Sequence, residues 1–180
     1  MRINFKNILI LLVISYVYLM LGNGILSLTN PDEVFYVQTA KEMAAQKTWL
    51  VPYLFDQPQF EKPILTYWLL RVSFLVFGVT SFGSRFFPAV FGMIGVLAVY
   101  LLAFAAFKDN RKAFISGLIL SSAGFYVGMT RTVFTDMIFS VFILLSLVSF
   151  YLGYSDKKRK TPAIIGFFVF TALAVLTKGP

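Results

Sequence analysis

The sequence predicts an all-α integral membrane protein, because it is strongly apolar, carries few charges and divides into long hydrophobic runs. Of its 180 residues, 58% are hydrophobic and 13% are charged, whereas soluble domains are about 25% charged. The chain contains no cysteine and no histidine, which excludes disulfides, thiol nucleophiles and the commonest general base. Any acid–base chemistry therefore falls to Asp, Glu, Lys or Tyr.

Five apolar runs are predicted to span the membrane: residues 8–21, 86–107, 113–129, 133–154 and 163–176. The first run follows a basic start, as a signal peptide does, but no small-residue cleavage site comes after it. We therefore expect this run to be retained as the first span.

The long loop between the first two spans, at about residues 27–85, is predicted to contain two further helices. Asn30 is a suitable cap, Pro31 suits the first helical position, and the acidic residues that follow favour the positive end of a helix to about residue 47. Residues 63–77 form a second apolar run that stops at a glycine. This run is shorter than the ~20 residues of a span, so we expect it to lie along the membrane interface.

The charges predict how these spans are oriented. The N-terminal segment and the second and fourth connections between spans would hold nine basic and two acidic residues: Arg2, Lys6, Lys108, Arg111, Lys112, Lys157, Lys158, Arg159 and Lys160, with Asp109 and Asp156. The opposite side would hold seven basic and six acidic residues. By the positive-inside rule, the N-terminus is cytoplasmic and the loop 27–85 is extracytoplasmic. We therefore expect a multi-pass protein of the cell inner (plasma) membrane.

The net charge of +8 is compatible with a nucleic-acid partner, but its placement argues against one. The basic residues lie in short connections between apolar runs, where membrane topology and lipid phosphate account for them. We therefore predict the lipid bilayer and lipid phosphate as partners and no nucleic acid.

The loop also concentrates the carboxylates of the chain. Five of the eight acidic residues lie in it: Asp32, Glu33, Glu42, Asp56 and Glu61. Asp136 begins the fourth span, where a carboxylate in hydrocarbon costs on the order of 3 kcal/mol and should face a cavity or a partner. On the predicted topology it lies at the same membrane face as Asp32. Two carboxylates and a cation at one face could form an acid–base site or a metal site.

Structural interpretations of the same residues stay open. Asp136 could simply pair with Arg131 and fix the turn before the span. Asp32 and Glu33 could be only a helix-start signature, and Lys62 could form a solvated pair with Glu61 rather than hold a phosphate. Lys178, in the last motif of the chain, could be a plain membrane-end anchor.

The order of five motifs is more specific than any one residue. PDE-x-x-Y follows the first span, then come WLVP, FEKP, R-x-x-x-x-D at the start of the fourth span, and LTKGP at residues 176–180. This series resembles the polyprenyl-phosphate-sugar-dependent membrane glycosyltransferases, which include the aminoarabinose-transferase-like enzymes and the protein mannosyltransferases. The resemblance covers essentially the whole chain. It implies the type C glycosyltransferase fold, and it implies that residues 1–180 are the N-terminal part of a larger bundle.

The resemblance also implies roles for individual residues. Asp32 and Asp136 correspond to the catalytic carboxylates. Glu61 corresponds to a residue that can help bind a divalent metal ion. The residues that would bind substrate are Glu33, Tyr36, Lys62 and Arg131, with Lys62 on the lipid-linked phosphate. Two positions depart from the pattern, since Val34-Phe35 replaces Ala-Arg and Gln59 replaces an aromatic residue.

The expected function is transfer of a sugar from a polyprenyl-phosphate-linked donor to a hydroxyl or phosphate of an acceptor. The acceptor would be lipid A, a glycan or a protein. Two alternatives are a transporter or flippase, and a membrane subunit without catalytic activity. The transporter is less favoured, because transporter sites lie near mid-membrane on broken helices, whereas the charges here gather at one face.

Overall fold

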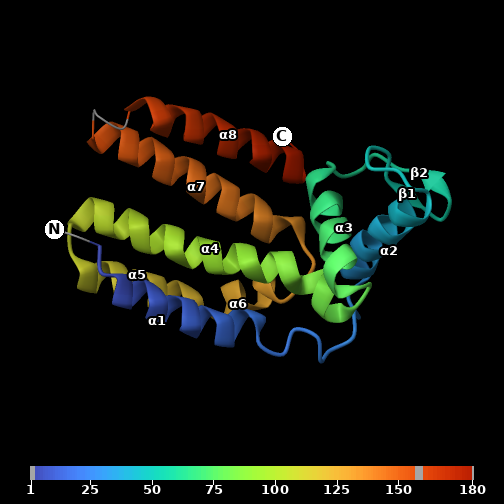
Figure 1. Cartoon of the computed structure of the whole chain (residues 1–180), viewed down its shortest axis with the longest axis horizontal. Coiled ribbons are helices and arrows are strands. Elements are labelled where there is room, and N and C mark those ends of the chain that lie inside the picture. Colours follow the sequence, from blue (N-terminus) through green and yellow to red (C-terminus); the bar gives the residue numbers. More distant parts are fainter. Residues whose placement is uncertain (1–2, 157–159, 180) are drawn as a thin grey trace.

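The computed structural model describes residues 3–156 and 160–179 and is almost entirely helical (Figure 1). The elements are α1 (Phe5–Ser15), the π-helical turn η1 (Tyr16–Met20), α2 (Pro31–Ala45), β1 (Tyr53–Leu54), β2 (Gln57–Pro58), α3 (Leu65–Phe77), α4 (Ser81–Phe107), α5 (Asn110–Ser122), α6 (Gly124–Thr130), α7 (Thr135–Ser155) and α8 (Lys160–Lys178). The two short strands pair in an antiparallel hairpin. The predicted all-α membrane fold is confirmed.

The predicted spans correspond to helices of unequal length. Among the described residues, α4, α7 and α8 are each long and apolar enough to cross a membrane. The predicted span at 113–129 is instead a broken pair, because α5 and α6 meet at a bend of 65°. Ala123, between them, has an extended backbone with ψ of 118°. The first apolar helix, Phe5–Met20, is shorter than α4, α7 and α8.

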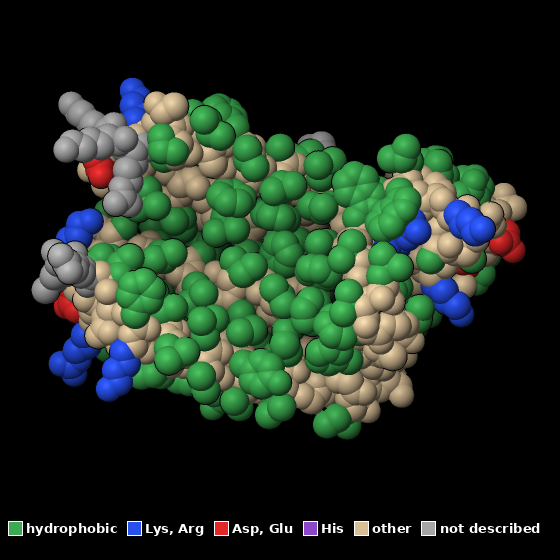
Figure 2. Space-filling model, in the orientation of Figure 1, with side chains coloured by type: hydrophobic (Ala, Val, Ile, Leu, Met, Phe, Trp, Pro, Cys, Tyr) green, Lys and Arg blue, Asp and Glu red, His purple; other side chains and the backbone are tan. Residues whose placement is uncertain are grey.

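The helices form a bundle with a separate assembly at one end. In Figure 1, α1, α4, α5, α7 and α8 run along the long axis, and the loop helices α2 and α3 cluster with the hairpin at one end. The start of α1, the α4–α5 connection, the end of α7 and the start of α8 lie at the opposite end. Apolar side chains cover the body between the two ends (Figure 2). Arg2 and residues 157–159, which the charge count included, lie outside the described residues.

The loop helices begin and end for the local reasons that their sequences predict. The Asn30 side chain accepts a hydrogen bond from the Asp32 amide at 2.9 Å, and Pro31 occupies the first turn of α2. Gly78 ends α3 with φ of 70°, a conformation that glycine adopts without strain. One boundary differs from the prediction. The helix α4 begins at Ser81, because the Thr80 side chain caps it, and this places Arg85 inside the helix.

Buried apolar residues join the loop helices to the bundle. One cluster contains Tyr36 and Val37 of α2, Tyr67 and Leu70 of α3, and Val133. Val133 belongs to the connection between α6 and α7, three residues before Asp136. The packing of this cluster therefore brings the first turns of α2 to the start of α7.

Candidate functional site

The site lies where α2, the start of α7 and the end of α8 meet. Asp32 and Tyr36 are one turn apart on α2 and share a face of the helix. Burial raises the pKa of Tyr36, and the carboxylates of Asp32 and Asp136 raise it too, while Thr135 and Lys178 act in the opposite direction. The Tyr36 hydroxyl is therefore within electrostatic reach of all four. The structure thus brings together three residues that the sequence singled out: Asp32, Tyr36 and Asp136.

Asp136 forms an ion pair with Lys178 at the end of α8. The suggested pair between Asp136 and Arg131 is therefore wrong. Both side chains of the observed pair are 44% exposed, so the pair is open to solvent. An exposed ion pair adds little stability, so Lys178 can exchange this partner for another anion.

A cleft of about 460 Å³ lies beside this pair and carries two cations. Its walls are formed by residues from the loop and from the end of α8: Leu50, Pro52, Phe60, Glu61, Lys62, Pro63, Ile64, Lys178 and Gly179. Lys62 and Lys178 therefore face one space, although they are far apart in the sequence. Two ammonium groups beside apolar walls suit an anionic headgroup on a hydrocarbon chain.

The cleft offers few ligands for a metal ion. The part of the chain that the structure describes contains no group of three or more acidic, His or Cys side chains that could hold one. Glu61 contributes a carboxylate to the cleft, but it shares that space with Lys62 and Lys178. These residues alone do not make the oxygen-rich site that Mg²⁺ or Ca²⁺ prefers. Metal binding at Glu61 stays a prediction.

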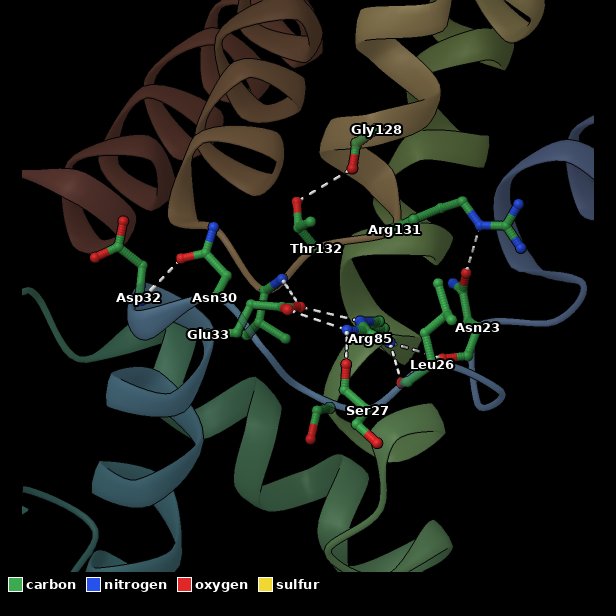
Figure 3. Close-up of polar contacts among 12 residues, drawn as sticks. Asn23, Leu26, Ser27, Asn30, Asp32, Glu33, Arg85, Gly128, Arg131 and Thr132 are labelled. Carbon is green, nitrogen blue, oxygen red and sulfur yellow. Dashed lines mark hydrogen bonds and ion pairs between the residues drawn. The ribbon is translucent and has the colours of Figure 1, made fainter.

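The structure places Glu33 away from this cleft. Its carboxylate is 2% exposed and both of its oxygens are hydrogen-bonded to Arg85. Figure 3 shows Glu33 directed toward Arg85, whereas the Asp32 carboxylate points away from that arginine. The predicted substrate contact of Glu33 remains untested, but its geometry favours an internal supporting role.

Arg131, also predicted to bind substrate, lies over the end of the first helix. Its Nε donates to the Asn23 side chain at 2.9 Å (Figure 3). The guanidinium also donates to the carbonyls of Tyr18 and Leu21. These contacts satisfy carbonyl groups where η1 ends. The substrate role of Arg131 is likewise untested.

Sequence reasoning gave no firm role to two residues that the structure makes central, Arg85 and Lys178. The available signal was their position, because an ionisable residue within or beside an apolar run needs a partner. That signal could not identify the partners, since Arg85 lies 52 residues from Glu33 and Lys178 lies 42 residues from Asp136.

These features define a polytopic all-α membrane protein with a charged site at one end of its helix bundle. Residues 61–180 match the family described as dolichyl-phosphate-mannose-protein mannosyltransferase, and the chain belongs to that family. The predicted family relationship is confirmed.

Known relatives of the chain are longer than it is. It is 34% identical over 157 residues to the undecaprenyl phosphate-alpha-4-amino-4-deoxy-L-arabinose arabinosyl transferase of Pseudomonas savastanoi, covering 87% of this chain and 30% of the relative. It is also 34% identical over 177 residues to an uncharacterized protein of Aquifex aeolicus, covering 98% and 34%. The chain therefore spans about a third of the length of the relatives it matches.

The fold is also that of a solved relative. Crystal structures of ArnT from Cupriavidus metallidurans, in the apo state and bound to undecaprenyl phosphate, both superpose with a TM-score of 0.85. The match covers 97% of this chain and 32% of ArnT, at 24% and 23% identity. This similarity establishes the predicted type C fold of the bundle.

Proposed function

We propose that the protein acts in sugar transfer from a polyprenyl-phosphate-linked donor at the extracytoplasmic membrane face. The observation that carries the proposal is the position of Lys178, which lines the two-lysine cleft and pairs with Asp136 beside Asp32 and Tyr36. A place for a lipid phosphate thus adjoins a place for carboxylate chemistry. The names of the relatives, aminoarabinose transferases that use undecaprenyl phosphate, support the same reaction class.

In the proposed reaction, the acceptor hydroxyl attacks the anomeric carbon of the donor sugar. The bond from that carbon to the phosphate oxygen breaks, and its electron pair leaves with the lipid phosphate. Lys62 and Lys178 stabilise the charge that grows on this phosphate. Asp32 accepts the proton of the attacking hydroxyl, whether that hydroxyl belongs to an alcohol or to a protonated phosphate. Direct displacement inverts the configuration at the anomeric carbon.

Asp136 and Tyr36 would orient the reactants. Asp136 holds Lys178 at the cleft and can accept a hydrogen bond from the sugar or the acceptor. Tyr36 stays protonated at neutral pH, since its environment raises its pKa, and it would donate a hydrogen bond rather than act as a base. Positioning of this kind contributes much of the rate in reactions with a good leaving group.

The acceptor is proposed to be lipid A, a glycan or a protein hydroxyl or phosphate. No step of this mechanism requires a metal ion. The predicted divalent ion near Glu61 would be tested by chelation during the transfer assay.

The proposal is tested by transfer of labelled sugar from a polyprenyl phosphate in membranes that contain the intact protein. We expect Asp32→Asn to lower the rate at least ~100-fold, because it removes the base without changing the shape of the side chain. Asp56→Asn, at an exposed carboxylate of the same loop, is the matched control and should keep the wild-type rate. A wild-type rate in Asp32→Asn would refute the assignment. Movement of the labelled lipid across the bilayer without a transfer product would instead favour a transporter.

A further inference from the structure

Glu33, the residue after Asp32, forms a buried ion pair with Arg85 of α4. Arg85 Nε lies 3.0 Å from one carboxylate oxygen of Glu33, and Nη2 lies 3.0 Å from the other. Glu33 is 2% exposed and Arg85 is 6% exposed. Two parallel charge-assisted hydrogen bonds between a planar guanidinium and a carboxylate fix the relative orientation as well as the distance of the two groups.

The remaining N–H groups of Arg85 hold the connection that leads into α2. Nη1 donates to the carbonyls of Asn23 at 3.2 Å and Leu26 at 2.7 Å, and Nη2 donates to that of Ser27 at 3.2 Å (Figure 3). This connection has no regular structure of its own. One guanidinium therefore ties it to the first turns of α4.

Glu33 reaches a third segment through one of the same oxygens. Its Oε1 also accepts a hydrogen bond from the Val133 amide at 3.0 Å. Val133 lies in the connection between α6 and α7, three residues before Asp136, and Glu33 directly follows Asp32. The Glu33 carboxylate thus links the start of α2, which carries Asp32, to the segment that leads into α7 and carries Asp136.

We propose that Glu33 and Arg85 are positioning residues that hold Asp32 and Asp136 in the relative placement that sugar transfer needs. This inference rests on the proposed function. Neither side chain touches substrate, since their polar atoms are buried against each other and against the backbone. Loss of this pair would shift Asp32 and Asp136 independently, and displacements of about 1 Å at a reacting centre can cost 10²-fold in rate.

The kinetic test uses Glu33→Gln, which keeps the shape and removes the charge, and Arg85→Lys, which keeps the charge and removes the planar fork. We expect each to lower kcat at least ~30-fold per folded protein molecule. The KM for the lipid-linked donor and the affinity for undecaprenyl phosphate should stay within about threefold of wild type. A wild-type kcat, or a loss of donor affinity as large as that of Lys62→Ala, would overturn the proposal.

A second readout does not depend on activity. Hydrogen exchange in lipid nanodiscs should accelerate in Glu33→Gln and Arg85→Lys at residues 22–30 and 130–136. The Glu33–Arg85 pair, called the brace below, no longer holds these segments in either variant. Exchange in α5 should be unchanged, and Asp32→Asn should match wild type throughout. If the brace segments respond in this way but the wild-type protein transfers no sugar, the proposed function and the positioning role in it both fail. If wild type transfers sugar but these segments do not respond, the brace alone fails.

The double variant Glu33→Gln/Arg85→Gln covers the case in which a single variant does not fold, because it leaves no unpaired buried charge. It should fold, exchange rapidly at the same two segments and retain the low kcat. A double variant with wild-type kcat would overturn the positioning role.

Discussion

Lys178 shows how one residue can belong to two sites. Its ammonium group pairs with Asp136 and lines the cleft that contains Lys62. Because the pair is 44% exposed on both sides, its contribution to stability is at most ~1 kcal/mol. A cation held so weakly is available to a phosphate that enters the cleft.

The substitution Lys178→Met tests this dual position. We expect affinity for undecaprenyl phosphate to fall about tenfold, which corresponds to ~1.4 kcal/mol, while the thermal midpoint changes little. Binding would be measured with the protein in nanodiscs. The control is Lys47→Met, at an exposed lysine of the same loop, which should bind the lipid as wild type does. Equal affinity in Lys178→Met would remove this lysine from the proposed phosphate site.

At the level of single residues, the sequence could predict position along the membrane normal but not partners. Asp32 and Tyr36 follow the first apolar run and Asp136 begins the fourth, so the hydropathy pattern predicts that all three lie at one end of the bundle. The choice of Lys178 rather than Arg131 as the partner of Asp136 depends on which helices pack side by side. The hydropathy pattern does not determine how each helix is rotated about its axis, because several faces of these helices are equally apolar.

At the level of elements, the break between α5 and α6 is the largest departure from the predicted spans. The run 113–129 contains no proline and has the length of one span, so its hydropathy favours a continuous helix. Ser121, Ser122 and Gly124 surround the break, and residues of this kind permit a kink without requiring one. In the structure, the Tyr126 hydroxyl of α6 donates to the Gly92 carbonyl of α4 at 2.7 Å. This contact is tertiary. It requires a small residue at the right place on a neighbouring helix, which periodicity alone does not reveal.

Two glycines of α4, Gly92 against Thr130 and Gly95 against Tyr126, allow α6 to approach α4. Gly95 gives the sharper test. A Cβ atom there would lie 2.2 Å from the Tyr126 hydroxyl oxygen and 3.1 Å from Val141. Small residues at such contacts let helix backbones come close within membranes. We expect Gly95→Ala to destabilise the protein by about 1–3 kcal/mol, because the added methyl group overpacks the interface. Thermal unfolding in detergent would measure this.

Two variants sharpen the test of the α4–α6 contact. Gly128→Ala, on α6 itself, adds a methyl group where no atom lies within 4 Å, and it should not lower the thermal midpoint. Tyr126→Phe removes the hydroxyl that the new methyl group would meet, so Gly95→Ala/Tyr126→Phe should be more stable than Gly95→Ala alone. If Gly95→Ala is as stable as Gly128→Ala, the close approach of these helices does not exist in solution.

At the level of the whole molecule, a group of basic residues and the acidic loop lie at opposite ends of the helix bundle. Lys108, between α4 and α5, and Arg111 and Lys112, in the first turn of α5, lie at one end of the bundle with the start of α1. The acidic loop lies at the other end (Figures 1 and 2). The helix α3 has 13 residues and packs with α2 and the start of α4, at the loop end of the bundle. This placement agrees with its predicted position at the interface, because a helix of 13 residues is too short to cross.

The predicted topology has a direct test, because residues 1–180 contain no cysteine. Gln46→Cys and Lys112→Cys each introduce one thiol at an exposed position, the first at the loop end of the bundle and the second at the basic end. An impermeant maleimide applied to right-side-out vesicles should label position 46 at once and position 112 only after the membrane is opened. Labelling of both from outside would mean that α3 crosses the membrane. Labelling of position 112 alone would place Asp32 and Lys62 in the cytosol, on the wrong side for the proposed extracytoplasmic donor.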